Sequence, residues 1–343
     1  MKKGVVFLIC IIGLCCCDRA SHNEYIYRGH TMGTSYMVKI AYPKLDKQRV
    51  EEVRQVINQT LQRVNKEMSP YIEISEISRF NTFRDTTSFS VSCSFARVVQ
   101  EALDISKISG GAFDVTVAPL VNLWGFGTKG RRISPPTDAA IDSVMADIGY
   151  QALQVTPDCH LRKTKPRLSI DLSAIAKGYG VDAVGAVIDS FGFKNYLVEV
   201  GGEVVTRGVN GDGKIWWVGV DQPKFDQLPG AMLFDTLAIS DKAVATSGDY
   251  RNYFEFEGKY YSHTIDPVTG RPVTHNLAST TVIADNCMLA DGLATAIMVL
   301  GPEKGIEMLK YYPGVESLLI LRDAEDRYST RQTPGFSAYV VKR

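Results

Sequence analysis

The sequence has no excess of charge of either sign. Its 38 lysines and arginines balance its 38 aspartates and glutamates, and the isoelectric point is near 6.9. Nucleic-acid-binding domains usually carry a basic excess, so we expect no nucleic acid among the partners. The chain also lacks acidic runs, internal repeats and low-complexity tracts, which excludes acidic tails, solenoids and fibrous folds.

Cysteine is scarce outside the first seventeen residues. Four of the seven cysteines lie in the leader MKKGVVFLICIIGLCCC, and only Cys93, Cys159 and Cys287 follow. An odd number of widely spaced cysteines predicts neither a disulfide framework nor a zinc site. Cys287 lies in an apolar stretch, so we expect it to be a small core residue.

A hydrophobic run long enough to cross a membrane is also missing. The leader places Lys2 and Lys3 before an apolar run over 5–14. That run is too short to span a bilayer but is typical of an export signal. We therefore expect the folded domain outside the cytoplasm, facing the periplasm or the outside of the cell.

The end of the leader resembles a bacterial lipobox, in which a leucine stands three residues before the lipidated cysteine. Cys17 fits best, because Leu14 then takes the leucine position. Choosing Cys16 would put Gly13 there, and choosing Cys15 would put Leu14 where a small residue is expected. We predict a signal peptide over 1–17, lipidation at Cys17 and a tether over 18–24. A cleaved secretory signal without a lipid is the alternative.

The remaining chain has ordinary globular composition, with 45% hydrophobic and 22% charged residues, and enough length for one large core. Apolar spacing and capping residues predict several helices: 46–68, 94–108, 137–149, one from Ser173 after a strand RLSIDL, and 286–301. Strands with turns at Asn210-Gly211 and Glu257-Gly258 are predicted between 196 and 263. Because strands and helices do not alternate regularly, we predict an α+β fold, not a Rossmann fold.

The helix near the C-terminus carries two oxygen donors on one face. Asp291 and Thr295 are four residues apart, which places them one above the other. Carboxylate and hydroxyl oxygens suit Mg²⁺. The alternative is a solvated polar stripe in which Thr295 bonds back to its own helix.

The stretch SIDLSAIAKGYG combines an acid, a capping residue and a lysine. Asp171 is expected to end a strand, Ser173 to cap a helix, and Lys177 to lie one turn inside it. A helix N-terminus with a nearby lysine is a candidate phosphate site. A capped helix with a surface lysine is the alternative. Gly178 and Gly180 weaken the helix, which predicts close approach by a ligand or by neighbouring backbone.

The stretch YSHTIDPVTGRPV places His263 and Asp266 before a Pro-x-x-Gly turn. Such a turn fixes its flanking side chains, and catalytic groups are often presented in this way. The alternative is a hairpin with a half-buried histidine.

In EVGGEV, two glycines inside a strand predict a bulge or close ligand approach. GFGTKG matches G-x-G-x-x-G, but no parallel strand precedes it and RRISPP follows it, so we expect a mobile loop and no dinucleotide site.

Read together, the segments resemble one family, the bacterial FAD:protein FMN transferases, also called the thiamine-biosynthesis lipoprotein ApbE family. The matching stretches, in family order over about 30–301, are HTMGTSYMV, MSPYIEISEISRFN, SGGAFDVTVAPLVNLWGFG, SIDLSAIAKGYGVD, YLVEVGGEV, AVATSGDYRNYF, YSHTIDPVTGRPV and ADGLATAIMVLG. The resemblance implies a single large domain over 25–343, of ApbE or T-fold type, with a largely antiparallel sheet and packed helices.

The resemblance also implies an activity: Mg²⁺-dependent transfer of FMN from FAD to a threonine or serine hydroxyl of a target protein, with release of AMP. It implies Mg²⁺ ligands at Asp291, Thr295 and the Ala174 carbonyl. The implied FAD contacts are Met32, Tyr71, Ala112, Phe113, Asp114, Asp171, Lys177, His263 and Ile265. His263, held beside the scissile phosphates, is inferred to be a general base or a transition-state donor.

The partners implied are FAD, exported or membrane redox proteins that carry the acceptor residue, and the membrane through the lipid anchor. Two other functions stay open at the level of sequence. An FAD pyrophosphatase would use water in place of the acceptor hydroxyl. A non-enzymatic flavin-binding lipoprotein would need no metal, so Asp291, Thr295 and Lys177 argue against it.

Overall fold

A computed structural model describes residues 23–225, 228, 230–323 and 327–342. Its helices are α1 (Lys47–Met68), α2 (Glu76–Thr82), α3 (Cys93–Ile108), α4 (Ala118–Leu123), α5 (Asp138–Met145), α6 (Ala176–Ser190), α7 (Cys287–Leu300) and α8 (Pro302–Met308). Its strands are β1 (Asn23–Thr31), β2 (Thr34–Tyr42), β3 (Phe89–Ser90), β4 (Leu153–Thr156), β5 (His160–Lys163), β6 (Tyr196–Val200), β7 (Glu203–Arg207), β8 (Trp216–Asp221), β9 (Leu233–Ile239), β10 (Ala243–Gly248), β11 (Tyr253–Phe256), β12 (Lys259–Ser262), β13 (Ile265–Asp266), β14 (Arg271–Pro272), β15 (Leu277–Ala284), β16 (Glu316–Arg322) and β17 (Tyr328–Gln332). Short 3₁₀ turns are η1 (Val115–Val117), η2 (Tyr150–Ala152), η3 (Leu309–Tyr311) and η5 (Phe336–Ala338).

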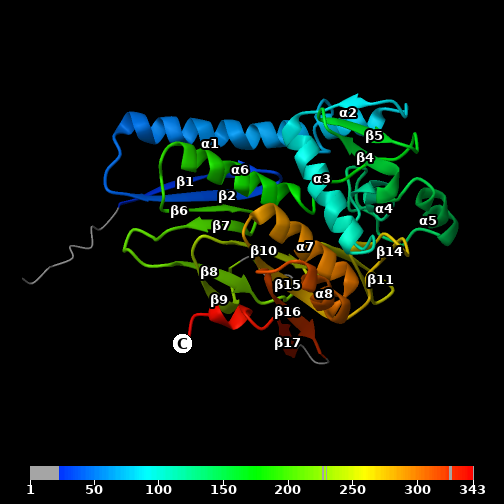
Figure 1. Cartoon of the computed structure of the whole chain (residues 1–343). Coiled ribbons are helices and arrows are strands. Elements are labelled where there is room, and N and C mark those ends of the chain that lie inside the picture. The colour runs from blue at the N-terminus through cyan, green and yellow to red at the C-terminus, as the bar shows by residue number, and fades with distance from the viewer. Residues whose placement is uncertain (1–22, 226–227, 229, 324–326, 343) are drawn as a thin grey trace, which may run out of the picture.

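An eight-stranded sheet forms the centre of the molecule (Figure 1). Its strand order is β1-β2-β6-β7-β10-β15-β16-β17, and every neighbouring pair is antiparallel. The predicted α+β class with a largely antiparallel sheet is confirmed, and the arrangement is not Rossmann-like.

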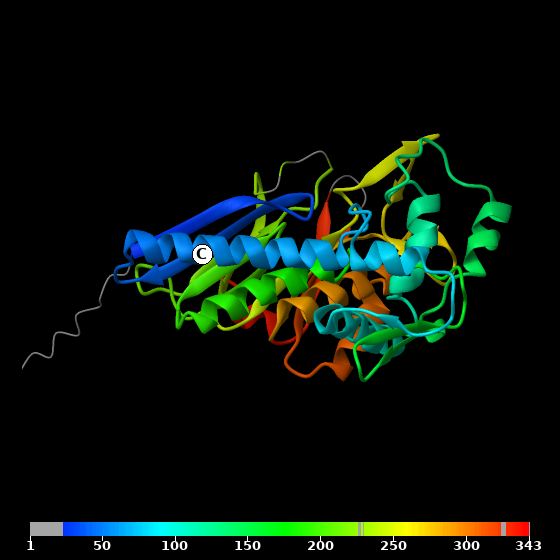
Figure 2. The same ribbon diagram turned by 90° about the horizontal axis from the view of Figure 1, so that it is seen from above.

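One face of the sheet is covered by helices. α1 packs on α6, α6 packs on α7 and on β6 and β7, and α7 packs on β10 and β15. Seen from above, α1 runs along most of the length of the molecule (Figure 2). Apolar residues recur along α1 every three or four positions. The buried residues of the helix include Val53, Ile57, Leu61 and Val64. This pattern forces one stripe of the helix into the core.

The other face of the sheet is covered by the β8–β9 hairpin and the C-terminal segment. Trp216, Leu237 and Phe336 pack there against apolar side chains of the central strands. The chain between α1 and α6 builds a separate lobe beside the sheet, with α2 to α5 and the three-stranded sheet β3-β5-β4 (Figure 1). The molecule is thus a helix layer, a sheet and a hairpin layer, with a lobe at one end.

The helix boundaries follow the capping residues in the sequence. Asp46 caps α1, Thr137 caps α5 and Asn286 caps α7, each through a side-chain oxygen that accepts a backbone N–H. The predicted helices over 46–68, 94–108 and 286–301 are confirmed to within a residue or two, and that over 137–149 ends four residues earlier, at Met145. The Glu257-Gly258 turn joins β11 to β12 with both residues at positive φ, as a tight hairpin requires.

Two local predictions are wrong. Ser173 does not cap a helix, because the Asp171 carboxylate accepts its N–H and its hydroxyl and folds the segment into a turn. α6 therefore begins only at Ala176, and RLSIDL does not form a strand of any sheet. The glycines of EVGGEV do not lie inside a strand either. Gly201 and Gly202, at φ of 62° and 106°, form the hairpin turn between β6 and β7.

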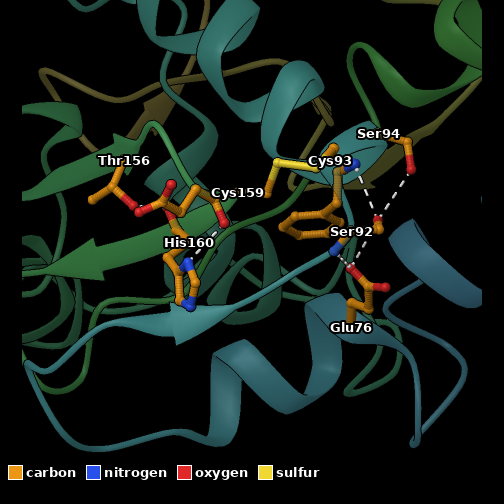
Figure 3. Close-up of a disulfide and its surroundings, with 9 residues drawn as sticks. Glu76, Ser92, Cys93, Ser94, Thr156, Cys159 and His160 are labelled. Atoms are coloured by element: carbon orange, nitrogen blue, oxygen red, sulfur yellow. Dashed lines mark hydrogen bonds between the residues drawn. A yellow bond between two sulfur atoms is a disulfide. The ribbon is translucent and has the colours of Figure 1, made fainter.

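The prediction of no disulfide is also wrong. Cys93 and Cys159 are bonded, and the bond joins the start of α3 to the β4–β5 turn (Figure 3). The Glu76 carboxylate accepts the N–H and the hydroxyl of Ser92 next to it, which fixes the same helix end. Cys287 is free and fully buried, so the core role predicted for it is confirmed.

The leader and its predicted lipidation at Cys17 lie outside the described residues. The tether prediction over 18–24 is two residues too long, because Asn23 and Glu24 already pair with Tyr42 and Ala41 in the sheet. Within the described part of the chain, none of the helices has the length and hydropathy of a membrane span.

Candidate active site

A cavity of about 730 Å³ opens where distant segments of the chain converge. The β1–β2 turn, the end of α1, the start of α6, the β6–β7 turn, β10, β13 and one face of α7 all contribute to its wall. Nine residues predicted from the sequence line it together: Met32, Tyr71, Asp171, Ala174, Lys177, His263, Ile265, Asp291 and Thr295.

Three predicted residues do not line the cavity. Ala112 and Phe113 are buried, and Phe113 belongs to the core. The Asp114 carboxylate accepts the N–H groups of Thr116 and Tyr150, each at 2.8 Å, and burial raises its pKa. Asp114 therefore links η1 to η2. None of Ala112, Phe113 and Asp114 is among the residues that line the cavity, so their expected ligand contacts have no support there.

A cluster of one cation and two carboxylates lies in the cavity wall. Lys177 Nζ is 3.0 Å from Glu203 Oε1 and 3.7 Å from Asp291 Oδ1. Burial disfavours the ammonium, but the two carboxylates outweigh that effect and raise the pKa of Lys177. Burial and the nearby Asp291 raise the pKa of Glu203, although Lys177 opposes this. The lysine is thus held charged.

One oxygen of the Glu203 carboxylate lacks a hydrogen-bond partner among the described residues. Its Oε2 is buried and has no hydrogen-bond partner within the described structure. Asp291, only 2% exposed, is better satisfied, because its Oδ2 accepts the N–H of Gly178 at 2.9 Å. A buried carboxylate oxygen without a partner is costly, so an additional donor or cation in the cavity would stabilise it.

The glycines of α6 permit this cluster. A Cβ on Gly178 would come within 2.3 Å of the Cys287 carbonyl oxygen, at the start of α7. Only glycine lets the two helices approach so closely that Lys177 and Asp291 meet. A Cβ on Gly180 would lie 2.6 Å from the Met32 methyl group. The predicted close approach of neighbouring backbone is confirmed at Gly178, whereas the close neighbour of Gly180 is a side chain.

His263 is anchored by its backbone and by one ring nitrogen. Its N–H donates to the Asn252 carbonyl at 3.0 Å, and its Nδ1 lies 3.0 Å from the same oxygen. Because a carbonyl only accepts, Nδ1 carries the proton and Nε2 keeps a lone pair. Desolvation by the surrounding protein lowers the pKa of His263, and the charge of Lys177 lowers it further. The hydrogen bond to the Asn252 carbonyl raises it.

The turn after His263 is rigid. The Gly270 N–H donates to the Asp266 carbonyl at 2.8 Å, and the Trp124 indole N–H donates to the Gly270 carbonyl at 2.9 Å. Gly270 has a φ of 70°, which favours glycine. The ring of Phe126 meets the His263 ring edge-on, with centroids 6.3 Å apart. The turn therefore places the imidazole firmly in the cavity wall.

The oxygen donors on α7 are not a solvated stripe. α7 is buried on nearly all sides, and the Thr295 hydroxyl lies 3.3 Å from the Ser247 hydroxyl. With Ala174 at the same cavity, the donors are a carboxylate, a hydroxyl and a carbonyl, all hard oxygens. No group of three or more His, Cys, Asp or Glu side chains within the described ranges could hold a metal by itself.

Sequence reasoning missed two charged residues of the cavity. Glu203 follows the glycine turn after β6, and that turn was the only local signal for it. Arg251 also lines the cavity, and its guanidinium is 2.7 Å from an Asp221 oxygen. Arg251 comes directly after AVATSGDY, but nothing in its spacing marks it as a site residue.

The ApbE family model matches residues 32–319 of the chain. A FAD:protein FMN transferase of Vibrio cholerae serotype O1 is 39% identical over 343 residues, which covers all of both chains. The solved structure of the flavin transferase ApbE from Vibrio cholerae has a TM-score of 0.84 at 38% identity, covering 93% of this chain and 99% of that one. The apo flavinyl transferase ApbE of Pseudomonas stutzeri has a TM-score of 0.83 at 34% identity, with 93% and 97% covered. The protein described here therefore belongs to the ApbE family.

Proposed function

We propose that the protein is an FAD:protein FMN transferase, an enzyme that moves FMN from FAD onto a threonine or serine hydroxyl of an acceptor protein. The observation that carries the proposal is the joint placement of a charged Lys177 and an anchored His263 in one cavity. The relatives that match almost the whole chain are named for this transfer, which supports the same reaction here.

The reaction exchanges one phosphorus–oxygen bond for another. The acceptor hydroxyl oxygen bonds to the phosphorus on the FMN side of the pyrophosphate. The bond from that phosphorus to the bridging oxygen breaks, and AMP leaves with the bridging oxygen. The hydroxyl proton passes to a base. Such a transfer needs little covalent chemistry from the protein, so positioning and electrostatic stabilisation dominate.

His263 is the candidate base. Its Nδ1–H is fixed on the Asn252 carbonyl, which leaves the Nε2 lone pair to accept the proton. A lowered pKa keeps the imidazole neutral near pH 7, as a base must be before it acts. The rigid turn at Gly270 holds the ring in place without help from the ligand.

Lys177 and Arg251 are the candidate phosphate contacts. Both line the cavity, and both are held by carboxylates that keep them charged and oriented, Glu203 and Asp291 for Lys177 and Asp221 for Arg251. In a cavity with protein walls, a cation stabilises developing phosphate charge more strongly than it would in water.

The family resemblance also implies Mg²⁺, and the donors present fit that ion. Asp291, Thr295 and the Ala174 carbonyl would hold it, with water and ligand phosphates completing a shell that one carboxylate cannot fill. Bound there, Mg²⁺ would neutralise pyrophosphate charge. The Asp291 oxygen that faces Lys177, Oδ1, would be the ligand with formal charge.

The test is to mix the purified protein with FAD, Mg²⁺ and a candidate threonine-bearing acceptor. Transfer gives a fluorescent acceptor band and an equal amount of AMP. FMN and AMP free in solution would identify an FAD pyrophosphatase instead. FAD that stays intact and bound, with several acceptors and with added Mg²⁺, would identify a flavin-binding protein and overturn the proposal.

We further propose that the protein is an exported lipoprotein, anchored through Cys17, whose acceptors are exported or membrane redox proteins. The Cys93–Cys159 disulfide supports export, because disulfides persist mainly in oxidising compartments. The lipobox-like Leu14-Cys15-Cys16-Cys17 supports the anchor.

A further inference from the structure

A second cavity, of about 740 Å³, lies against the first. The two share Pro70, Tyr71 and Asp171 in their walls. The segment 125–132 also joins them, because Phe126 lines the first cavity and Gly127 to Arg132 line the second. We call the second cavity the basic groove. It continues the active-site cavity along the surface of the lobe.

The groove is cationic in a protein with no net charge. Its wall holds five cations, Arg84, Lys129, Arg131, Arg132 and Arg167, and two acids, Asp147 and Asp171. Both acids are already engaged. Asp147 is 3.0 Å from Arg167, and Asp171 accepts the N–H of Ser173. Five cations against two acids leave the wall of the groove with a formal charge of +3.

Three of the cations are available to a ligand. Arg84, Lys129 and Arg131 are exposed and make no hydrogen bond or ion pair through their side chains within the described residues. Lys129 lies in the GFGTKG loop, for which the sequence offered no function. Thr128 contacts Asn122 at 3.4 Å, and a Cβ on Gly127 would come 2.4 Å from that Asn122 amide oxygen. The loop is thus packed against α4 and presents its cations at the groove.

We infer that the basic groove receives an acidic segment of the acceptor protein. This inference rests on the proposed function, because the acceptor hydroxyl must reach His263 and the chain around it must lie on the adjoining surface. The groove begins at that point, since Phe126 touches His263. Carboxylates on the acceptor would meet Arg84, Lys129 and Arg131, which steers association and fixes register.

The inference is tested with a labelled peptide of one threonine flanked by three aspartates on each side, and its asparagine counterpart. Binding to the wild type is measured by fluorescence anisotropy, with and without AMP, at low and at higher salt. We expect only the aspartate peptide to bind, and more weakly at higher salt, because exposed charges are screened.

The variant is Lys129→Glu/Arg131→Glu, and its control is Lys214→Glu/Lys304→Glu, which makes the same charge change at exposed positions outside both cavities. We expect the groove variant to lose about tenfold or more in peptide affinity and the control to lose less than twofold. FAD affinity should be unchanged in both. Equal peptide affinity in the two double variants would overturn the inference.

Two further outcomes separate this inference from the proposed function. If the groove variant loses FAD affinity, or if AMP displaces the peptide, the groove holds the nucleotide end of FAD and the inference is wrong. If the aspartate peptide binds as expected but the wild type forms no FMN conjugate with any acceptor, the proposed function fails, and the groove stands as a site for acidic segments.

Discussion

His263 is the residue whose replacement separates chemistry from binding. We expect His263→Asn to lower saturated FMN transfer by about 10²–10⁴-fold, the usual contribution of a general base, while FAD affinity stays near normal. As the pH is lowered, the wild-type rate should start to fall only when the pH is below the usual pKa range of histidine. This is expected because the pKa of His263 is lowered and its neutral form is the active one. The variant should lack this acidic limb. The measurement is transfer against pH at saturating FAD.

His160 provides a matched control for that experiment. Its Nδ1 also contacts a backbone carbonyl, that of Asp158 at 2.8 Å, but it lies in β5 beside the disulfide and outside both cavities. His160→Asn should transfer FMN normally. A His263→Asn protein that turns over normally at saturating FAD and differs only in affinity would show that the histidine binds and does no proton chemistry.

Asp291 is expected to set the magnesium requirement. Asp291→Asn keeps an oxygen to accept the Gly178 N–H but removes the charge. We predict that transfer at limiting Mg²⁺ falls by about 100-fold or more and recovers partly as Mg²⁺ is raised. Circular dichroism should show an unchanged fold. Normal transfer at limiting Mg²⁺ would exclude Asp291 as a ligand.

Lys163 should make stability depend on pH. Its buried ammonium donates to the Phe80 and Leu168 carbonyls, and burial, aided by Arg84, lowers its pKa from 10.5 to about 8. Between these values the unfolded chain holds the proton and the folded chain does not. The free energy of unfolding therefore rises with pH across this window and loses that contribution as pH falls through 8.

The comparison for Lys163 is Lys163→Met, which keeps the aliphatic stem. The free energy of unfolding of both proteins is measured in urea between pH 7.5 and 10. Over this range the wild-type value should rise relative to that of Lys163→Met by about 2–3 kcal/mol in total. A difference between the two proteins that does not change with pH would mean that the lysine keeps its proton in the folded state.

At the scale of secondary structure, the contact between α6 and α7 determines the active site. Gly178→Ala would force a Cβ to 2.3 Å from the Cys287 carbonyl oxygen, so the helices must separate. We expect a loss of about 1–3 kcal/mol in the free energy of unfolding and a large loss of transfer, because Lys177 and Asp291 move apart.

Gly185 on the same helix is the control for Gly178. Its Cβ would meet nothing closer than 3.3 Å, and alanine is the better helix former by up to about 1 kcal/mol. Gly185→Ala should therefore unfold at equal or higher urea concentration and keep its activity. If both alanine variants behave alike, helix propensity and not helix contact explains the glycines.

The sequence predicted elements wherever local signals decide them. The caps at Asp46, Thr137 and Asn286 and the turn at Glu257-Gly258 are properties of a few neighbouring residues. The start of α6 was missed because the Asp171 side chain competes with the helix for the N–H of Ser173. The disulfide was missed because Cys93 and Cys159 are 66 residues apart, and spacing does not specify pairing.

The candidate site was predictable only in part for the same reason. Asp291 and Thr295 share a helix face and Lys177 stands near a helix start, so local patterns found them. Local patterns also marked Asp171 and His263, and the family resemblance added the others. Glu203 and Arg251 could not be found, because their partners Lys177 and Asp221 lie far away in the sequence. Asp114 had the right residue type for a contact, but each of its two oxygens accepts a hydrogen bond within the protein, from Thr116 and from Tyr150.

At the scale of the whole molecule, the feature to test is the proposed attachment to the membrane. None of the helices in the described ranges has the length and hydropathy to cross a membrane. Acyl chains on Cys17, as proposed above, would anchor the protein, because each buried methylene adds about 0.8 kcal/mol to membrane binding.

Three neighbouring cysteines in the leader allow a strict test of that anchor. Labelled palmitate should enter the wild type and Cys16→Ser, because only Cys17 places Leu14 three residues upstream. Cys17→Ser should take up no label and leave the membrane fraction, while the purified domain keeps its FMN transfer activity, since the site lies wholly within the described fold. Label on Cys17→Ser would mean that Cys17 is not the lipidated residue. A wild type recovered without label in the soluble fraction would mean that the leader is cleaved as an ordinary secretory signal.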